Sequence, residues 1–250
     1  MLPTPDTSHV SYDQIYEPAE DSYLLLDTLS SASETTFLHS HFSSGHVPLV
    51  LEVGTGSGVV LAFLAANSAA LFNRPVCTIG SDLNRRACLA ASQTVRKACT
   101  PDAATFSTVV NADLTTPFRQ GEIDMLVFNP PYVPAELPDL ALHDKYNAAD
   151  ALSSSEAFDR DSHLLALSYA GGVDGMEVTD RLLDQLPTVL SRRGVAYVLL
   201  CAQNKPEAVK NRIRAWPGGW EADTVGTSGK KAGWEKLCIV RIMRKTVQSS

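Results

Sequence analysis

The chain has 250 residues, of which 44% are hydrophobic, and its net charge is −7. This length and composition suit one large folded domain over 1–250, and the acidic balance disfavours a stand-alone nucleic-acid binder, which carries a basic surface. Residues 205–250 are the exception, with ten Lys and Arg against four Asp and Glu. They form either a basic face or scattered charges on solvated helices and strands.

Targeting signals are not evident in the sequence. No run approaches 18 apolar residues, and residues 1–14 have neither the basic nor the apolar region of a signal peptide. The five cysteines are scattered without a CxxC pair, which is typical of free thiols in a reducing compartment and argues against a metal site. We expect no membrane association, a cytoplasmic location that could extend to the nucleus, and a flexible N-terminus over 1–15.

Short apolar strands alternate with helical stretches, which predicts an α/β fold around a mostly parallel sheet. An entry helix is expected over 20–31, followed by a Ser- and His-rich loop over 32–46. The next segment, Val47–Val53, is apolar enough for a strand that is buried on both faces. The following elements are predicted to be a helix over 59–71, a strand over 76–82, a helix over 84–98 with Asn84 as its cap, and strands over 106–110 and 123–128.

Residues 133–161 interrupt this alternation with seven acidic and two basic side chains. We expect a surface insertion there, acting either as a passive loop or as a lid that guides the substrate. The remaining elements are predicted to be a helix over 173–190, a turn over 191–194, a strand over 195–201, a helix over 205–215, and strands over 220–225 and 237–243. The last two strands form a C-terminal antiparallel hairpin in the simplest arrangement.

A glycine-rich loop, Gly54-Thr55-Gly56-Ser57-Gly58, joins the first strand to the next helix. Glycines here allow a tight turn and a close approach of the backbone to a ligand. Dinucleotide-binding loops have the spacing G-x-G-x-x-G and hold a pyrophosphate. This loop has the spacing G-x-G-x-G, and Glu52 before it would repel phosphate, which argues against a nicotinamide oxidoreductase. An acid at this position suits S-adenosylmethionine (SAM), which carries an ammonium and a sulfonium but no phosphate.

Acidic residues also stand at the ends of the next two strands. Asp82, followed by Leu83, is placed to accept hydrogen bonds from both hydroxyls of a ribose. Asp113 could accept from an adenine amino group, while the Leu114 amide donates to the ring. Each acid alone could be a helix cap or a loop residue. Because the carboxyl ends of parallel strands share one edge of the sheet, these acids and Glu52 together predict a SAM site.

The tetrapeptide Asn129-Pro130-Pro131-Tyr132 directly follows an apolar strand. The prolines fix φ and lack an N–H, but their carbonyls still accept hydrogen bonds. The Asn129 amide adds another acceptor, and Tyr132 adds a ring for stacking. A substrate amino group could donate to Asn129 and to the Pro130 carbonyl, which leaves the nitrogen lone pair directed at an electrophile. The motif therefore predicts methyl transfer to nitrogen, with an ordinary strand-ending turn as the alternative.

Taken together, these motifs resemble the class I SAM-dependent methyltransferases and, more narrowly, the HemK-related glutamine methyltransferases. The leading segment Tyr16-Glu17-Pro18-Ala19-Glu20-Asp21-Ser22 and the later Gly171-Gly172-Val173-Asp174-Gly175 resemble the eukaryotic branch. The resemblance runs from about Tyr16 to the C-terminus. It implies a Rossmann-like fold with a seven-stranded, mostly parallel sheet and a C-terminal antiparallel hairpin.

The resemblance also implies an activity, which is N5-methylation of the glutamine in the Gly-Gly-Gln motif of the class-1 release factor. SAM would be the cofactor and S-adenosylhomocysteine the product. The expected cofactor-binding residues are Tyr16, Pro18, Ser22, Glu52, Gly54, Thr55, Gly56, Gly58, Asp82, Leu83, Asp113, Leu114 and Asn129. The expected catalytic residues are Asn129, Pro130, Pro131 and Tyr132.

A partner protein is implied as well, because eukaryotic members of this family form a heterodimer with a small zinc-binding activator. In the usual strand order, Phe106–Val110 would be an exposed apolar edge, which invites pairing, so we expect the activator to dock there. The release factor could act as substrate together with its GTPase partner. The insertion over 133–161 is longer than the family pattern, so the substrate groove between Tyr132 and Gly171 is not defined by the resemblance.

Three other functions fit parts of the pattern. The tetrapeptide also suits the exocyclic amine of a flipped adenine, with Tyr132 stacking on the base. The acidic balance and the lack of a target-recognition domain argue against that nucleic-acid methyltransferase. A protein-lysine methyltransferase is a related alternative. A non-catalytic SAM-binding scaffold is less consistent with an intact tetrapeptide.

Overall fold

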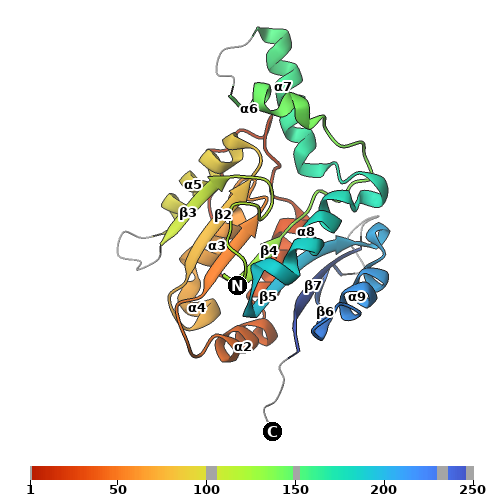
Figure 1. Ribbon diagram of the computed structural model, residues 1–250. Helices are drawn as coiled ribbons and strands as arrows, with labels where there is room; N and C mark the ends of the chain where they lie inside the picture. Colours follow the sequence, from red (N-terminus) through yellow and green to blue (C-terminus); the bar gives the residue numbers. More distant parts are fainter. Residues whose placement is uncertain (1, 100–105, 149–152, 230–235, 246–250) are drawn as a thin grey trace.

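The computed structural model describes residues 2–99, 106–148, 153–229 and 236–245, and it has a central sheet with helices on both faces (Figure 1). The strand order is β3-β2-β1-β4-β5-β7-β6. Strands β1 to β5 run parallel to one another, whereas β7 pairs antiparallel with both β5 and β6. The predicted mixed sheet, with its C-terminal hairpin, is confirmed. The strands are β1 (Leu49–Val53), β2 (Cys77–Asp82), β3 (Ser107–Asn111), β4 (Ile123–Phe128), β5 (Leu190–Cys201), β6 (Trp220–Thr227) and β7 (Leu237–Arg244).

Two hydrophobic layers cover the sheet because alternate side chains of each strand point to opposite faces. Val50 and Val127 pack with helices α1 to α4, and α5 packs beside α3. Leu51 and Leu126 pack with α8 and α9 on the other face. The helices are α1 (Glu20–Leu29), α2 (Ala32–His41), α3 (Val59–Ala66), α4 (Ser68–Phe72), α5 (Arg85–Ala98), α6 (His143–Ala148), α7 (Ser154–Tyr169), α8 (Glu177–Val189) and α9 (Pro206–Arg214), with short 3₁₀ turns η1 (Leu140–Leu142), η2 (Val173–Gly175) and η3 (Ala202–Asn204). Among the described helices, none is both long and apolar enough to cross a membrane.

One helix lies where the sequence predicts a loop. The Ser- and His-rich segment forms α2, and Ser31 caps its first turn by accepting a hydrogen bond from the Glu34 amide (3.3 Å). The Glu34 carboxylate is buried, and it accepts hydrogen bonds from Tyr197 Oη (2.7 Å) and Arg241 Nη1 (2.9 Å). The prediction of a loop was wrong because contacts from strands near the other end of the chain hold this helix.

The acidic insertion is helical rather than a simple loop. Its described part contains η1 and α6, and it continues into α7, whose capping box joins Ser153 and Glu156. Residues 149–152 of the predicted insertion lie outside the described residues. Figure 1 shows α6 and α7 standing above the sheet.

Two further expectations differ from the structure. The predicted turn over 191–194 is part of β5, at a point where its register with β4 shifts. Ser191 and Arg193 both bond there to the buried Asp124 carboxylate, which holds this irregular start of the strand in the sheet. The N-terminal segment, expected to be flexible, packs on α5, because Val10 and Ile15 are buried beside Ala87.

Candidate functional site

A cavity of about 650 Å³ lies at the carboxyl ends of β1, β2 and β4. The chain runs from β1 to β2 and β3 on one side and returns to β4 on the other, so this is the point where the strand order reverses. Ligands of open α/β sheets bind in the crevice at that point. The cavity is lined by the expected site residues Tyr16, Ser22, Glu52, Gly54, Thr55, Gly56, Asp82, Leu83, Asp113, Leu114, Asn129, Pro130, Pro131 and Tyr132.

Two expected cofactor residues, Pro18 and Gly58, do not line the cavity. Gly58 has φ +79°, and it precedes the first turn of α3. A Cβ at this position would lie 2.4 Å from Ala91 Cα of α5. Gly58 therefore allows α3 and α5 to pack closely, while the cavity wall is formed by Gly54, Thr55 and Gly56.

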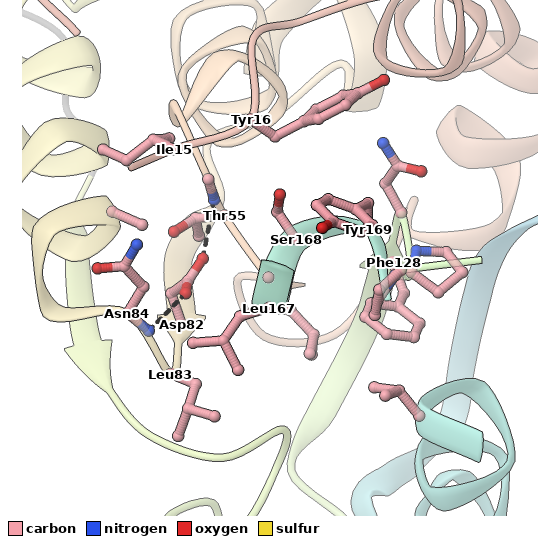
Figure 2. Close-up of a pocket in the computed structure, with 18 of the residues that line it drawn as sticks. Ile15, Tyr16, Thr55, Asp82, Leu83, Asn84, Phe128, Leu167, Ser168 and Tyr169 are labelled. Atoms are coloured by element: carbon pink, nitrogen blue, oxygen red, sulfur yellow. Dashed lines mark hydrogen bonds between the residues drawn. The ribbon is translucent and has the colours of Figure 1, made fainter. Parts of the chain in front are cut away.

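The Asp82 carboxylate is held by backbone amides of two loops, the glycine-rich loop after β1 and the loop after β2. Its Oδ2 accepts from the Gly56 amide (2.9 Å), and its Oδ1 accepts from the Asn84 amide (2.8 Å), as the dashed lines in Figure 2 show. Burial raises the pKa of Asp82 to about 6, although both hydrogen bonds oppose this shift. Each oxygen keeps a lone pair, so this carboxylate suits a vicinal pair of hydroxyl donors such as those of a ribose.

Three polar atoms around the cavity have no hydrogen-bond partner among the described residues. They are Glu52 Oε2, Thr55 Oγ1 and Asn129 Oδ1, and all three are buried. Buried polar atoms in native proteins are rarely left unpaired, so this cluster indicates that a ligand supplies the partners. Burial raises the pKa of Glu52 well above its usual value, and the nearby Asp82 raises it further. An ammonium donor would satisfy Glu52 and stabilise its ionised form. Glu52 therefore fits the amino-acid end of SAM.

An arginine that was not predicted from the sequence contacts Asp113, one of the two residues expected to bind adenine. Arg181 of α8 lines the cavity, and its guanidinium bonds to Oδ2 of Asp113. Leu114, the next residue, has φ +52°. The Arg181 guanidinium therefore orients the carboxylate expected to face the adenine. The sequence predicts the helix that carries Arg181, but nothing near Arg181 in the sequence indicates its contact with Asp113.

The tetrapeptide loop is held by a second glycine-rich segment, which the sequence analysis singled out only for its resemblance. A Cβ on Gly171 would lie 2.5 Å from the Pro131 carbonyl oxygen, and one on Gly175 would lie 2.0 Å from that of Tyr132. Asn204 Nδ2 donates to the Gly175 carbonyl (3.3 Å). Close backbone packing of this kind holds the Pro131 and Tyr132 carbonyls, and so supports the loop that also carries Asn129 and Pro130.

Helix α7 supplies another wall that the sequence analysis did not identify. Leu164, Leu167, Ser168 and Tyr169 line the cavity. Figure 2 shows Leu167 and Ser168 reaching into the space between Asp82 and Phe128. Their spacing along the helix is the only signal that the sequence holds, and it does not distinguish a cavity wall from a core face.

Known proteins share this fold and much of this sequence. The family model described as methyltransferase small domain matches residues 28–154. The chain is 33% identical to "eRF1 methyltransferase catalytic subunit mtq2" of Schizosaccharomyces pombe, over 98% of this chain and 96% of that protein. It is 32% identical to "Methyltransferase HEMK2" of Mus musculus, over 97% of each chain. Among solved structures, the hMettl16 catalytic domain shares the fold, with 14% identity, a TM-score of 0.51, and coverage of 94% of this chain and 73% of that one.

Proposed function

The chain belongs to the HemK-related methyltransferases within the methyltransferase small domain family, and we propose that it methylates a glutamine side chain of the class-1 polypeptide release factor. It is an enzyme that uses SAM as the methyl donor. The observation that carries the proposed acceptor is the buried Asn129 Oδ1, unpaired among the described residues, beside the Pro130 carbonyl in a cavity that fits SAM. The near full-length similarity to a protein named eRF1 methyltransferase supports the same substrate.

The acids at the strand ends would hold the cofactor. Glu52 would accept from the ammonium, Asp82 from the ribose hydroxyls, and Asp113 from the adenine amino group. When bound, SAM supplies an electrophilic methyl group on its sulfonium. The raised pKa values of Glu52 and Asp82 mean that a cationic or hydroxyl-bearing ligand favours their ionised forms, so binding is coupled to proton release.

The tetrapeptide would act by positioning the acceptor. An amide nitrogen is a poor nucleophile because its lone pair is delocalised into the carbonyl. Asn129 Oδ1 and the Pro130 carbonyl would each accept one N–H of the glutamine amide, and Tyr132 would stack on its plane. Fixing the reacting groups in this way contributes roughly 7–11 kcal/mol at best. The same two acceptors would stabilise the positive charge that develops on the glutamine nitrogen, which then loses one N–H proton to water and becomes the neutral methylated amide.

The edge strand β3 would carry the activator subunit. Strand β3 ends the sheet, and Phe106 beside it is 63% exposed. An unpaired edge next to an exposed aromatic ring favours association with another chain. Phe106→Lys should therefore reduce co-purification with a small zinc-binding activator, whereas Val47→Lys, another exposed apolar position, should not. Equal recovery of the two variants with the activator would argue against this interface.

The test of function is transfer of labelled methyl from SAM to purified release factor, with its Gly-Gly-Gln glutamine intact or replaced by asparagine. The enzyme would be assayed with and without the activator. We expect label on the intact factor and none on the asparagine variant. Label on neither factor, with SAM still bound, would redirect the search to lysine and nucleic-acid acceptors.

The catalytic assignment has a separate test. Asn129→Ala should reduce turnover by more than tenfold, because one of the two acceptors that orient the amide is lost. Binding of SAM should remain largely intact, because Glu52 and Asp82 are unchanged. A variant that keeps more than about a tenth of the wild-type rate would contradict the positioning mechanism.

A further inference from the structure

Helix α6 contacts the loop that follows Asp82. His143 and Asn147 are four residues apart, so they lie on one face of this helix. His143 Nε2 lies 3.0 Å from the Leu83 carbonyl oxygen, and Asn147 Nδ2 lies 3.3 Å from the same atom. A carbonyl only accepts, so His143 donates from Nε2. Two side chains of the insertion thus converge on the residue next to the expected ribose carboxylate.

The contact is reinforced on both sides of this loop. Asn147 Oδ1 accepts from the Arg85 amide (2.7 Å) at the first turn of α5. Asn147 Nδ2 also lies 3.1 Å from Asn111 Oδ1, and Asn111 Nδ2 donates to the Leu83 carbonyl (2.7 Å). The loop between β2 and α5 is therefore tied at its carbonyl and at its amide to α6 and to the end of β3.

The same short helix supports the α7 wall of the cavity. The His163 ring of α7 lies 5.9 Å from the His143 ring and 5.1 Å from the Tyr146 ring. The next residue of α7, Leu164, lines the cavity. At the N-terminal side, Gln14 Nε2 donates to Asp161 of α7 (2.7 Å). Helix α6 is thus packed between the Asp82 loop and the helix that covers the cavity.

We propose that α6 is a latch that holds the nucleoside end of the cofactor, with His143 and Asn147 as positioning residues that act through Leu83. Neither residue lines the cavity, so their effect is indirect. The inference rests on the proposed function in one respect, that Asp82 binds the cofactor ribose. Loss of the latch leaves the Asp82 loop and α7 less constrained, so the cofactor dissociates faster. Turnover at saturating cofactor is retained, because Asn129 and Pro130 are on a different loop that the glycine-rich segment Gly171–Gly175 supports.

The experiment compares variants that break single contacts. His143→Ala removes the imidazole donor, and His143→Gln restores a neutral amide donor of similar reach. Asn147→Asp keeps an acceptor for the Arg85 amide but loses the donor to Leu83. Asp144→Ala is the matched control, because Asp144 is an exposed neighbour on the same helix. Asp82→Asn is the reference for direct loss of a cofactor contact.

Three readouts are measured on the full chain, with the activator where the chain requires it. They are the Kd of SAM and of S-adenosylhomocysteine by calorimetry, the cofactor dissociation rate by stopped-flow displacement, and the melting temperature without ligand. We expect His143→Ala and Asn147→Asp to raise both Kd values about tenfold, as befits the loss of a hydrogen bond with its packing. His143→Gln should recover most of the affinity, and Asp144→Ala should match the wild type.

Each outcome separates the latch from the proposed function. If Asp82→Asn loses affinity while folded His143→Ala and Asn147→Asp keep wild-type Kd values, the latch is wrong and the ribose assignment stands. If Asp82→Asn also binds normally, the assignment of the site itself fails. If His143→Ala melts well below the wild type, the decision falls to His143→Gln and Asn147→Asp, whose unchanged affinity or unchanged dissociation rate would overturn the proposal.

Discussion

Two carboxylates are buried at opposite ends of the same sheet, and their surroundings differ sharply. Asp124, near the start of β4, accepts hydrogen bonds from Ser191 Oγ (2.8 Å), Arg193 Nε (2.9 Å) and the Leu49 amide (3.1 Å). Burial alone would raise its pKa, but these partners lower it below the usual value. Glu52, near the end of β1, has one oxygen without a partner among the described residues, and burial raises its pKa.

This is the difference expected between a structural carboxylate and one that binds a ligand. Asp124 has its counter-charge within the chain, so folding satisfies it. Glu52 and its neighbour Asp82 are left with raised pKa values, which folding tolerates and a ligand can relieve. Perturbed carboxylates of this kind cluster at functional sites.

Removal of the structural carboxylate should have the largest effect. Asp124→Ala leaves the Arg193 guanidinium without its ion-pair partner, and we expect a loss of about 3–5 kcal/mol of unfolding free energy. Chemical denaturation measures this loss, and the Kd of SAM for the folded fraction should not change. In the double variant with Arg193→Met, the two losses should be less than additive. Additive losses, or a weakened cofactor, would show that the two ends of the sheet are not distinct.

The sequence predicted the carboxyl end of the parallel strands better than their amino end. The strand Ile123–Phe128 has the predicted bounds. Glu52, Asp82 and Asp113 lie at or near the carboxyl ends of β1, β2 and β3 as expected, because each position is set by its own strand. The partners of Asp124 lie at the irregular start of β5. The Ser-Arg-Arg-Gly sequence of this segment is typical of a turn, so the strand was not predicted there. Helix α2 was missed for the same reason, because its Glu34 is fixed by Tyr197 and by an arginine of β7.

Helix α7 and the glycine segment were harder to predict, because their roles depend on which elements face the cavity. In the sequence, Gly171–Gly175 is distinctive only through its family resemblance, which gives it no role. In the structure its glycines touch the Pro131 and Tyr132 carbonyls, a contact between segments about forty residues apart. A single sequence carries no signal for such a pairing, whereas periodicity and strand-end chemistry are local and can be read directly.

Gly175→Ala tests whether the tetrapeptide end depends on close backbone packing. Gly175 has φ +67°, and an added Cβ would lie 2.0 Å from the Tyr132 carbonyl oxygen. We expect a loss of about 3 kcal/mol of unfolding free energy, with a fall in kcat and little change in the Kd of SAM. Gly121→Ala is the control, because Gly121 has φ +73° but no atom within 4 Å of the added Cβ. Equal losses in the two variants would mean that backbone conformation alone, and not this contact, matters.

The raised pKa of Asp82 should appear as a pH dependence of stability. Because its pKa rises from 3.8 unfolded to about 6 folded, ionisation destabilises the folded state. This destabilisation is absent below pH 3.8, grows between the two values, and is complete above about pH 6. The wild type should therefore lose roughly 2–3 kcal/mol relative to Asp82→Asn as the pH rises from about 4 to about 7. Denaturation of both proteins across this range measures the difference, and a constant gap would refute the shift.

Glu52→Gln should have the smallest net effect, and like Asp82→Asn it should stabilise the free protein at neutral pH. The raised pKa of Glu52 means that its ionised form destabilises the free protein above the usual glutamate pKa of 4.5, and glutamine removes that charge. We expect the variant to gain only about 1 kcal/mol of unfolding free energy at neutral pH, because the buried glutamine amide also lacks a partner and its desolvation offsets part of the gain. The gain should vanish below pH 4.5, where the carboxyl is protonated in both states.

The same substitution should weaken SAM binding, because the ammonium loses its carboxylate. A variant that melts higher than the wild type without ligand and lower with saturating SAM would place Glu52 among residues kept for binding at the expense of stability. A variant that loses stability at every pH would instead make Glu52 a structural acid like Asp124. The sharper measurement is therefore whether the order of the two melting temperatures reverses when SAM is added. Loss of affinity alone would also follow from a damaged fold.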